Sequence, residues 1–425
     1  MTQHPSSKTT SFLDQPPSCL QFCPASPNDF VVGTYLLSEK KTTDEDGLET
    51  IQQSKTGSLQ LWHLEPETDA LTQKSTYPII VAVFDLHFHP KQDNILAIAT
   101  SDASVSIFRV SPESETGFTL LWTKTVHEDP SVPALFLAWL PDNWLIPSPA
   151  KANQDGFAVT FSDGRTGVFG LTGDATGLEA VEGGDVDEQI TELGSFDAKQ
   201  PIEVWFVAVA SYLNSSAEIP AYTPYMFTGN DFGSLHTRRF ADINAQSEVN
   251  DEEEFSPLPD TLISTDDKAL HHTAGVTSIL PLPIPLSHAA AKGEPLLLTG
   301  SYDDSLRVCH ACRGGRGEVL AEVGLGGGVW RLQLLDSTTT AGPQGEEWTF
   351  LVLASCMHGG TRVVSISVGA DGKANIEILA QFTEHESMNY ASDVWKGKAA
   401  GSGSELRVVS SSFYDKRVCV WRVQV

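Results

Sequence analysis

The chain has 425 residues, 40% of them hydrophobic, which is enough for one large β architecture or for two to three ordinary domains. Its formal net charge is -28, from 55 acidic and 27 basic residues. A chain this acidic is unsuited to hold nucleic acid, which requires clustered Lys and Arg, and it should repel anionic membranes and attract basic partners.

The N-terminal residues 1–17 are polar and contain no apolar core, so we expect a disordered tail and no signal peptide. The longest apolar stretches, such as Pro78–Phe84 and Trp205–Ala210, are too short to cross a bilayer. Six cysteines in a chain of this length do not make a disulfide scaffold. We therefore expect a soluble, cytoplasmic protein.

From residue 18 onward, short runs of β-branched and aromatic residues alternate with clusters of Gly, Pro, Asn, Asp and Ser, which predicts many short strands. A pair of small residues, a polar residue and a β-branched run recur seven times, and we expect each copy to form a strand, a tight turn and a second strand. The copies are Gly57–Leu64, Ala99–Val110, Thr160–Leu171, Thr228–Phe240, Thr299–Ala311, Ala354–Ser367 and Ser411–Val423.

A further apolar strand precedes each copy. These strands are Cys19–Cys23, Val83–His89, Leu135–Leu140, Val204–Ala210, Val276–Pro281, Val329–Leu335 and Ser392–Lys396. Seven such units predict an all-β, seven-bladed WD40-type β-propeller that forms a single domain over residues 18–425. Most copies lie further apart than the ~40–45 residues of a WD repeat. We assign the surplus mainly to acidic loop insertions at about residues 172–198 and 242–267, which contain no Lys or Arg.

Five of the copies carry an aspartate at the equivalent turn position, where its carboxylate can accept backbone N–H groups and hold the turn. These residues are Asp102, Asp163, Asp231, Asp303 and Asp415.

Several motifs resemble the WD-repeat diphthine methyl esterase family of the diphthamide pathway. They are EVWFVA (203–208), TGNDFGSL (228–235), HHTAGVTSI (271–279), TGSYDDSLRV and GGGVWRLQ (within 299–333), LASCMHGG (353–360) and SSFYDKRVCVW (411–421). The similarity runs from about Cys19 to the end, is strongest after Pro201 and leaves out the acidic insertions. TGSYDD occurs in many WD repeats, whereas the ordered combination is more specific.

The resemblance implies a methyl ester hydrolase that acts on one modified histidine of translation elongation factor 2. In that family the enzyme hydrolyses the methyl ester of an over-methylated diphthine and releases diphthine and methanol. The expected partner is therefore elongation factor 2, with no nucleic acid and no membrane, and we expect a monomer. The alternative is a non-catalytic WD40 scaffold, which is the more common role of propellers as a class.

Ester hydrolysis requires a nucleophile or activated water, a base, and donors for the developing oxyanion. The chain contains no GxSxG motif, so a base-activated water is the preferred form. In a propeller, polar residues at the start of each blade converge on one rim of the channel. They are Asp85, His87, Glu203, His272, Arg331, His358 and Asp393.

From these we select five candidate catalytic residues. His272 or His358 could be the base, although a histidine at a blade start more often bonds within its own blade. Glu203 and Asp393 could orient that histidine or hold the substrate cation, or could merely accept N–H groups at a strand start. Arg331 could polarise the ester carbonyl or pair with a carboxylate of its blade.

The substrate carries a quaternary ammonium, as the resemblance implies, and such a group favours aromatic faces beside an acid. Trp205, Trp330 and Trp395 each lie close in sequence to one of these polar residues and could form the cage. Packing between blades is the alternative for each.

No cofactor or metal is expected. Cys309 and Cys312 have the spacing of a zinc half-site, but in an outer propeller strand this spacing more often reflects small apolar residues.

Overall fold

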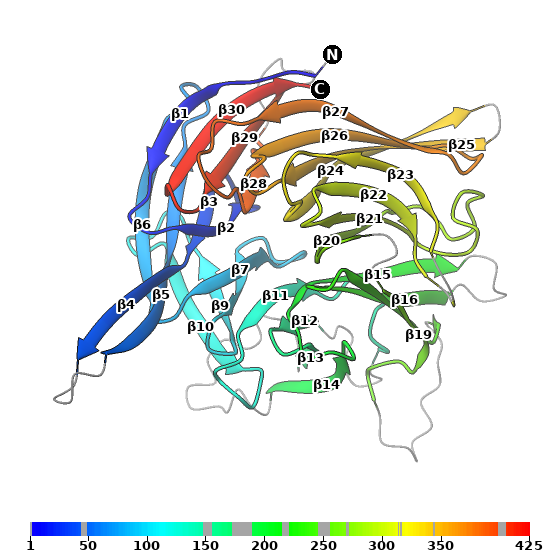
Figure 1. Ribbon diagram of the computed structural model, residues 1–425, viewed down its shortest axis with the longest axis horizontal. Coiled ribbons are helices and arrows are strands. Elements are labelled where there is room, and N and C mark those ends of the chain that lie inside the picture. The colour runs from blue at the N-terminus through cyan, green and yellow to red at the C-terminus, as the bar shows by residue number, and fades with distance from the viewer. Residues whose placement is uncertain are drawn as a thin grey trace.

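The computed structural model describes residues 2–43, 49–147, 155–171, 189–214, 221–244, 256–268, 272–312, 314, 317–342, 345–397 and 405–425. They form seven antiparallel sheets arranged in a ring, so the predicted seven-bladed β-propeller is confirmed (Figure 1). The sheets follow one another around the ring in chain order, and the two termini meet at the last blade.

The first four blades run from the inner strand outward as follows. Blade 1 contains β2 (Pro17–Cys23), β3 (Ser26–Thr34), β5 (Glu49–Leu64) and β6 (Leu71–Ile79), and β4 (Leu36–Thr43) pairs with the first half of β5. Blade 2 contains β7 (Val83–Phe88), β8 (Ile95–Thr100), β9 (Ser104–Val110) and β10 (Phe118–Thr125). Blade 3 contains β11 (Ala134–Trp139), β12 (Gly156–Phe161), β13 (Arg165–Leu171) and β14 (Ile190–Asp197). Blade 4 contains β15 (Val204–Asn214), β16 (Ala221–Asn230), β17 (Ser234–Phe240) and β19 (Thr261–Lys268), with β18 (Ile243–Asn244) beside β16.

The last three blades repeat this plan. Blade 5 contains β20 (Val276–Pro281), β21 (Leu296–Ser301), β22 (Ser305–His310) and β23 (Val319–Gly324). Blade 6 contains β24 (Arg331–Gly342), β25 (Gly345–Ser355), β26 (Thr361–Val368) and β27 (Ala374–Phe382). Blade 7 contains β28 (Ala391–Val394), β29 (Glu405–Ser412), β30 (Arg417–Gln424) and, as its outer strand, β1 (Ser7–Phe12).

The packing of the blades explains the sequence patterns of the strands. The second strand of a blade packs against a neighbouring blade on each face, so β8 and β21 are buried at every residue. Both begin with an apolar run and end in small residues or Thr. The outer strands have one face in solvent. Residues of β1 therefore alternate between half-buried and exposed, and β14 exposes about half of its residues. The core is thus divided into layers between adjacent blades, for example the layer of Leu298, Phe350 and Val352 between blades 5 and 6.

Two strands differ from the prediction, and so do the acidic insertions described below. Residues 7–12 of the expected disordered tail form β1, which pairs with β30 over Ser7–Phe12 and closes blade 7. The alternating polar sequence SKTTSF lacks an apolar run because an outer strand gains its order mainly by pairing. Gly57–Leu64 is part of the single strand β5 and contains no turn.

The expected acidic insertions are shorter than predicted. Residues 190–197 form β14 and residues 261–268 form β19, the outer strands of blades 3 and 4. In β14 the acidic residues Glu192 and Asp197 are exposed, whereas in β19 Asp267 is buried and the side chain of Asp266 is only 6% exposed. Composition alone does not distinguish either strand from a loop. Residues 172–188 and 245–255 lie outside the described residues.

Candidate functional site

A pocket of about 170 Å³ lies on the axis of the ring, between the inner strands β2, β7, β24 and β28. Inner strands of a propeller converge on the axis, so residues of blades 1, 2, 6 and 7 line this one space. Its charged or titratable lining comprises Asp85, His87, Arg331, Tyr390 and Asp393, together with the buried thiol Cys19. Two of the five predicted catalytic residues, Arg331 and Asp393, are therefore brought together there.

Asp85 and His87 form a hydrogen-bonded pair on β7. The Nε2 atom of His87 lies 2.8 Å from Oδ2 of Asp85, and Asp85 itself is 4% exposed. Residues i and i+2 of a strand share a face, so both side chains point into the channel. If Nε2 donates to Asp85, Nδ1 of His87 remains unprotonated and has no hydrogen-bond partner among the described residues. This pair therefore has the geometry of an oriented general base.

Arg331 reaches into the channel from the start of β24 and faces the same pair. Its Nη2 atom lies 4.0 Å from Oδ1 of Asp85, and its guanidinium carbon lies 4.8 Å from the ring centre of Phe136 and 4.7 Å from that of Trp330. Nη1 donates to the carbonyls of Thr277 and Trp330. Burial lowers the pKa of Arg331, and the nearby Asp85 partly opposes that shift. Arg331 can thus supply a fixed positive charge in a partly dry space.

Asp393 is held by its surroundings on all sides. Its oxygens accept the backbone N–H of Phe22 at 2.8 Å, the amide of Gln333 at 2.7 Å and the N–H of Val394 at 2.7 Å. Burial raises its pKa, although these donors and Lys396 act in the opposite direction. Because Phe22 belongs to blade 1 and Gln333 to blade 6, Asp393 joins three inner strands at the wall of the pocket.

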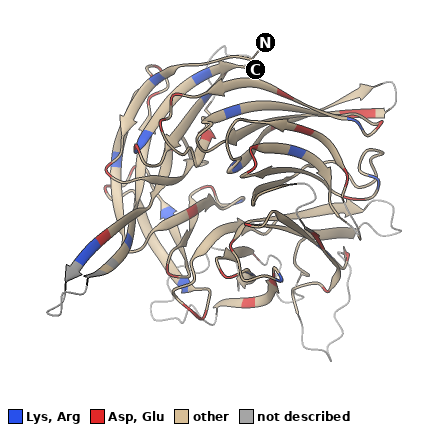
Figure 2. Ribbon diagram, viewed as in Figure 1, with Lys and Arg blue, Asp and Glu red and all other residues tan. Residues whose placement is uncertain are grey.

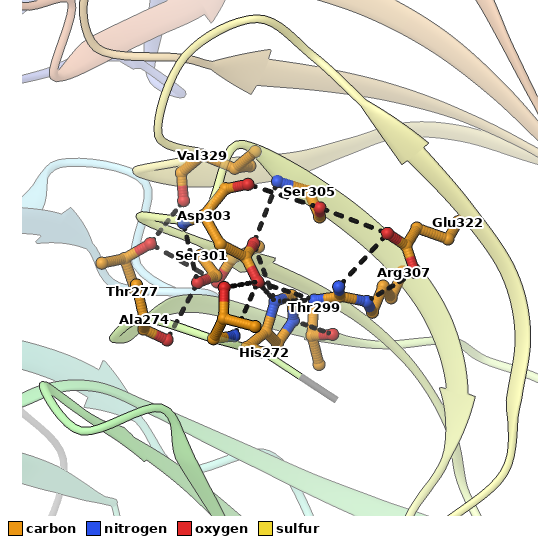
Figure 3. A network of polar contacts seen from close by, with 12 residues as sticks. His272, Ala274, Thr277, Thr299, Ser301, Asp303, Ser305, Arg307, Glu322 and Val329 are labelled. Carbon is orange, nitrogen blue, oxygen red and sulfur yellow. Dashed lines mark hydrogen bonds and ion pairs between the residues drawn. The ribbon is translucent and has the colours of Figure 1, made fainter. Parts of the chain in front are cut away.

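His272 lies inside blade 5 and does not line the pocket (Figure 3). Its Nδ1 atom lies 3.1 Å from Asp303 and its Nε2 atom 2.9 Å from Oγ1 of Thr299, while Arg307 bonds the same aspartate at 3.0 Å. Burial alone would raise the pKa of Asp303, but hydrogen bonds from His272 and from the N–H of Thr273 outweigh it and hold that pKa far below its usual range. Both ring nitrogens of His272 are occupied, so the geometry favours a structural role.

The remaining two predicted residues also lie outside the pocket lining. His358 is exposed in the turn between β25 and β26, next to Met357, whose φ of 41° is left-handed. Glu203 is half-buried immediately before β15, and its backbone carbonyl accepts the N–H of Asp231. Burial raises the pKa of Tyr302, and the negative charges of Asp231 and, more weakly, of the Glu203 carboxylate raise it further.

Two of the three predicted cage tryptophans meet. The ring centres of Trp205 and Trp330 are 5.5 Å apart, and Tyr302 lies 6.2 Å from the first and 6.0 Å from the second. The indole N–H of Trp205 donates to Asp231 at 2.7 Å. We call Trp205, Tyr302 and Trp330 the three-ring cluster; Trp330 also contacts Arg331, so the cluster borders the channel.

Trp395 lies elsewhere. It follows the last residue of β28, donates to Asn28 at 2.8 Å and is covered by the guanidinium of Arg407 at 4.6 Å. It packs against the layer between blades 7 and 1.

The sequence patterns placed Asp85 and His87 at the rim without giving them a role, and they did not single out Tyr302. The signal for the pair was present, since an Asp and a His two positions apart on an apolar strand face the same side. Tyr302 belongs to the TGSYDD turn, and only the proximity of blades 4, 5 and 6 places it beside Trp205 and Trp330.

Among the described residues, no group of three or more His, Cys, Asp or Glu side chains is placed to hold a metal ion. Burial raises the pKa of the Cys309 thiol to about 12. Cys312, three residues further along the chain, is also a buried free thiol. Within the described residues, no helix is long and apolar enough to cross a membrane.

Comparison with known proteins gives two relatives. The diphthine methyltransferase of Schizosaccharomyces pombe is 33% identical over 165 residues, 39% of this chain and only 41% of that protein's length. The diphthine methyltransferase homolog of Dictyostelium discoideum is 22% identical over 431 residues, 97% of this chain and 98% of that protein. The chain is similar to this relative along nearly its whole length. No protein-family model matches the chain.

Solved structures with a similar fold include Sqt1 of Chaetomium thermophilum bound to the N-terminus of the ribosomal protein L10. Its TM-score is 0.50 at 13% identity, over 98% of this chain and 100% of that one. Sqt1 of Saccharomyces cerevisiae also gives a TM-score of 0.50, at 12% identity and full coverage of both chains. At these identities the likeness concerns the fold alone.

Proposed function

We propose that this chain is a methyl ester hydrolase of diphthamide biosynthesis, which demethylates the methylated diphthine of elongation factor 2. The two relatives named for diphthine methylation support a role in that pathway. The observation that carries the hydrolytic step is the convergence of Asp85, His87 and Arg331 on the axial pocket.

In this proposal His87 is the general base. Its Nδ1 takes a proton from a water molecule as that water attacks the ester carbonyl, and Asp85 stabilises the imidazolium that forms. Arg331 stabilises the negative charge that develops on the carbonyl oxygen. The tetrahedral intermediate then collapses, the C–OCH3 bond breaks, and the methoxide leaves as methanol with the proton from His87. The products are the free carboxylate and methanol, with one proton released.

The three-ring cluster is the proposed binding site for the quaternary ammonium of the substrate. Aromatic faces attract such a cation by ~0.5–2 kcal/mol each. Glu203 and Asp231 add negative charge beside Tyr302, since both act on its pKa. Trp395 takes no part, because it packs in the layer between blades 7 and 1 and, among the described residues, makes no ring contact with the cluster.

The test is to incubate the purified protein with elongation factor 2 carrying methylated diphthine and to follow the loss of one methylene in mass. We expect wild-type protein to remove it and His87→Asn to lower kcat by ~10²–10⁴-fold, as the loss of a general base does. His63→Asn is the matched control, because His63 pairs with Asp29 in an outer part of blade 1.

If the folded wild-type protein leaves the mass unchanged, the hydrolase proposal is wrong, and the non-catalytic scaffold is the remaining function. Equal activity of His87→Asn and wild type would instead remove His87 as the base.

A further inference from the structure

Beyond the three-ring cluster, a second group of aromatic side chains lies around the same mouth of the channel, where the catalytic proposal does not use it. Tyr35 of blade 1 lies 5.3 Å from Phe84 of blade 2 and 6.0 Å from Phe413 of blade 7, measured between ring centres. Phe413 in turn contacts Tyr414 at 5.0 Å. We call these four residues the aromatic ledge.

The ledge is continuous with the proposed active site. Tyr390, which lines the axial pocket, lies 5.4 Å from Phe413 on one side and 5.1 Å from Trp330 on the other. A chain of ring contacts therefore leads from blade 2 across blades 1 and 7 to the three-ring cluster.

The ledge is open to solvent. Tyr414 is 69% exposed, and Tyr35, Phe84 and Phe413 are each half-buried. Exposed aromatic groups of this kind on a protein surface mark interaction sites, because a Tyr or Phe buries a large area on binding at a small cost in conformational entropy.

The charges at the two ends of this surface indicate what it binds. At the three-ring cluster, Glu203 and Asp231 form no ion pair with a Lys or Arg among the described residues, and Arg331, over the Trp330 ring, is the cation that acts on Tyr302. Two carboxylates against one guanidinium leave that end with a net negative charge, which favours a cation. At the ledge, Arg417 pairs with Glu386 at 2.7 Å and with Asp415 at 3.4 Å, so its charge is already engaged and the rings are the groups that remain free to bind. The complementary ligand has apolar side chains at one end and a positive charge at the other.

We propose that the aromatic ledge is the docking surface for an extended segment of the protein substrate, adjoining the modified histidine and carrying apolar side chains. This inference rests on the proposed function, since that function places the cationic group at the three-ring cluster and so leaves the flanking segment to cross Tyr390 onto the ledge. The ledge determines how tightly the protein substrate binds, whereas the channel residues determine the rate of hydrolysis.

The test compares the affinity of unmodified elongation factor 2 for wild-type protein and for Tyr414→Ala, by biolayer interferometry at fixed salt. Tyr414 is exposed, so its truncation should leave the fold intact, which a thermal melt verifies. We expect Kd to rise about tenfold, as for the loss of an aromatic anchor. Tyr414→Phe should bind like wild type because the ring is retained.

Leu120→Ala is the matched control, since Leu120 is 43% exposed on the outer strand β10 and lies outside the ledge. Unchanged affinity of Tyr414→Ala, an equal loss in Leu120→Ala, or no binding by wild-type protein would each overturn the docking surface. In hydrolysis assays, Tyr414→Ala should raise KM about tenfold and leave kcat unchanged. Ledge-dependent binding without any hydrolysis would retain the docking surface and remove the proposed function.

Discussion

At the scale of single residues, two histidines near blade starts have opposite environments. His272 has both ring nitrogens bonded within blade 5 and is 2% exposed, whereas His87 has one nitrogen on Asp85 and a side chain that is 33% exposed in the channel. A base must exchange a proton with a bound water, so one nitrogen must be accessible and unoccupied. Residue type and position at a blade start do not separate the two cases, but their hydrogen bonds do.

This contrast predicts the effect of His272→Gln. Removing the imidazole leaves the buried carboxylate of Asp303 and the hydroxyl of Thr299 with fewer partners, so the free energy of unfolding should fall by ~1–3 kcal/mol. The kcat per folded molecule should stay close to the wild-type value. Urea unfolding and the methylene-loss assay on the same preparation measure both. A large fall in kcat at wild-type stability would instead make His272 the base.

At the scale of elements, blade 7 is assembled from both ends of the chain. β1 pairs with β30, and Asp69 of blade 1 binds Arg407 and Arg422 of blade 7 at 2.9 Å and 2.8 Å. Within the blade, Ser410 of β29 bonds His385 at 2.8 Å and the indole of Trp421 of β30 at 3.0 Å. The last sheet therefore depends on a buried polar network as well as on pairing with β1.

His385 should make this blade sensitive to acid. Burial lowers the pKa of His385 to about 4. In the unfolded chain its pKa is about 6.5, so the unfolded state takes up a proton first as the pH falls. The resulting stability is fully present above pH ~6.5 and is lost toward pH ~4, by about 3 kcal/mol in total.

Urea unfolding between pH ~7.5 and ~4.5 tests this prediction. His385→Gln should flatten the dependence on pH, while His358→Gln, at an exposed turn, should leave it as in wild type. If His385→Gln and wild type share the same slope, the acid sensitivity has another source.

At the scale of the whole molecule, the ring brings side chains from distant parts of the chain to one axis. Asp and Glu are interspersed with Lys and Arg over the blades (Figure 2). Cys19 and Asp393, which are far apart in sequence, line the same pocket because inner strands of blades 1 and 7 are neighbours. The net charge of -28 surrounds this site with a negative field.

The whole-molecule charge predicts that association with elongation factor 2 weakens as salt rises. Exposed charges are screened over ~8–10 Å at physiological ionic strength, so the slower association at high salt should raise Kd. Titrations at increasing NaCl, with an uncharged osmolyte as the control for solvent effects, measure the trend. A Kd independent of salt would show that the acidic surface does not contribute.

Much of the fold was predictable from the sequence. All seven inner strands were located, because a short, largely apolar run precedes each copy of the repeat, and that pattern is local. Three of the five turn aspartates bind as expected: Asp163, Asp303 and Asp415 accept the backbone N–H of Arg165, Ser305 and Glu386. Asp102 instead accepts hydroxyl groups of its own turn, and Asp231 accepts the indole N–H of Trp205. The outer strands β1, β14 and β19 were missed, since strands with one solvated face and many polar residues resemble loops until their partners are known.

The sequence by itself determined the ring of seven blades, the acidic surface and the aromatic residues at the blade starts, because periodicity and composition are properties of the chain alone. Only the tertiary structure decided which polar residues share the axial pocket. It placed Asp85 and His87 beside Arg331, held His272 inside its blade and separated Trp395 from Trp205 and Trp330. The physical reason is that a contact across the channel depends on the packing of blades that are distant in sequence, and no local pattern encodes that distance.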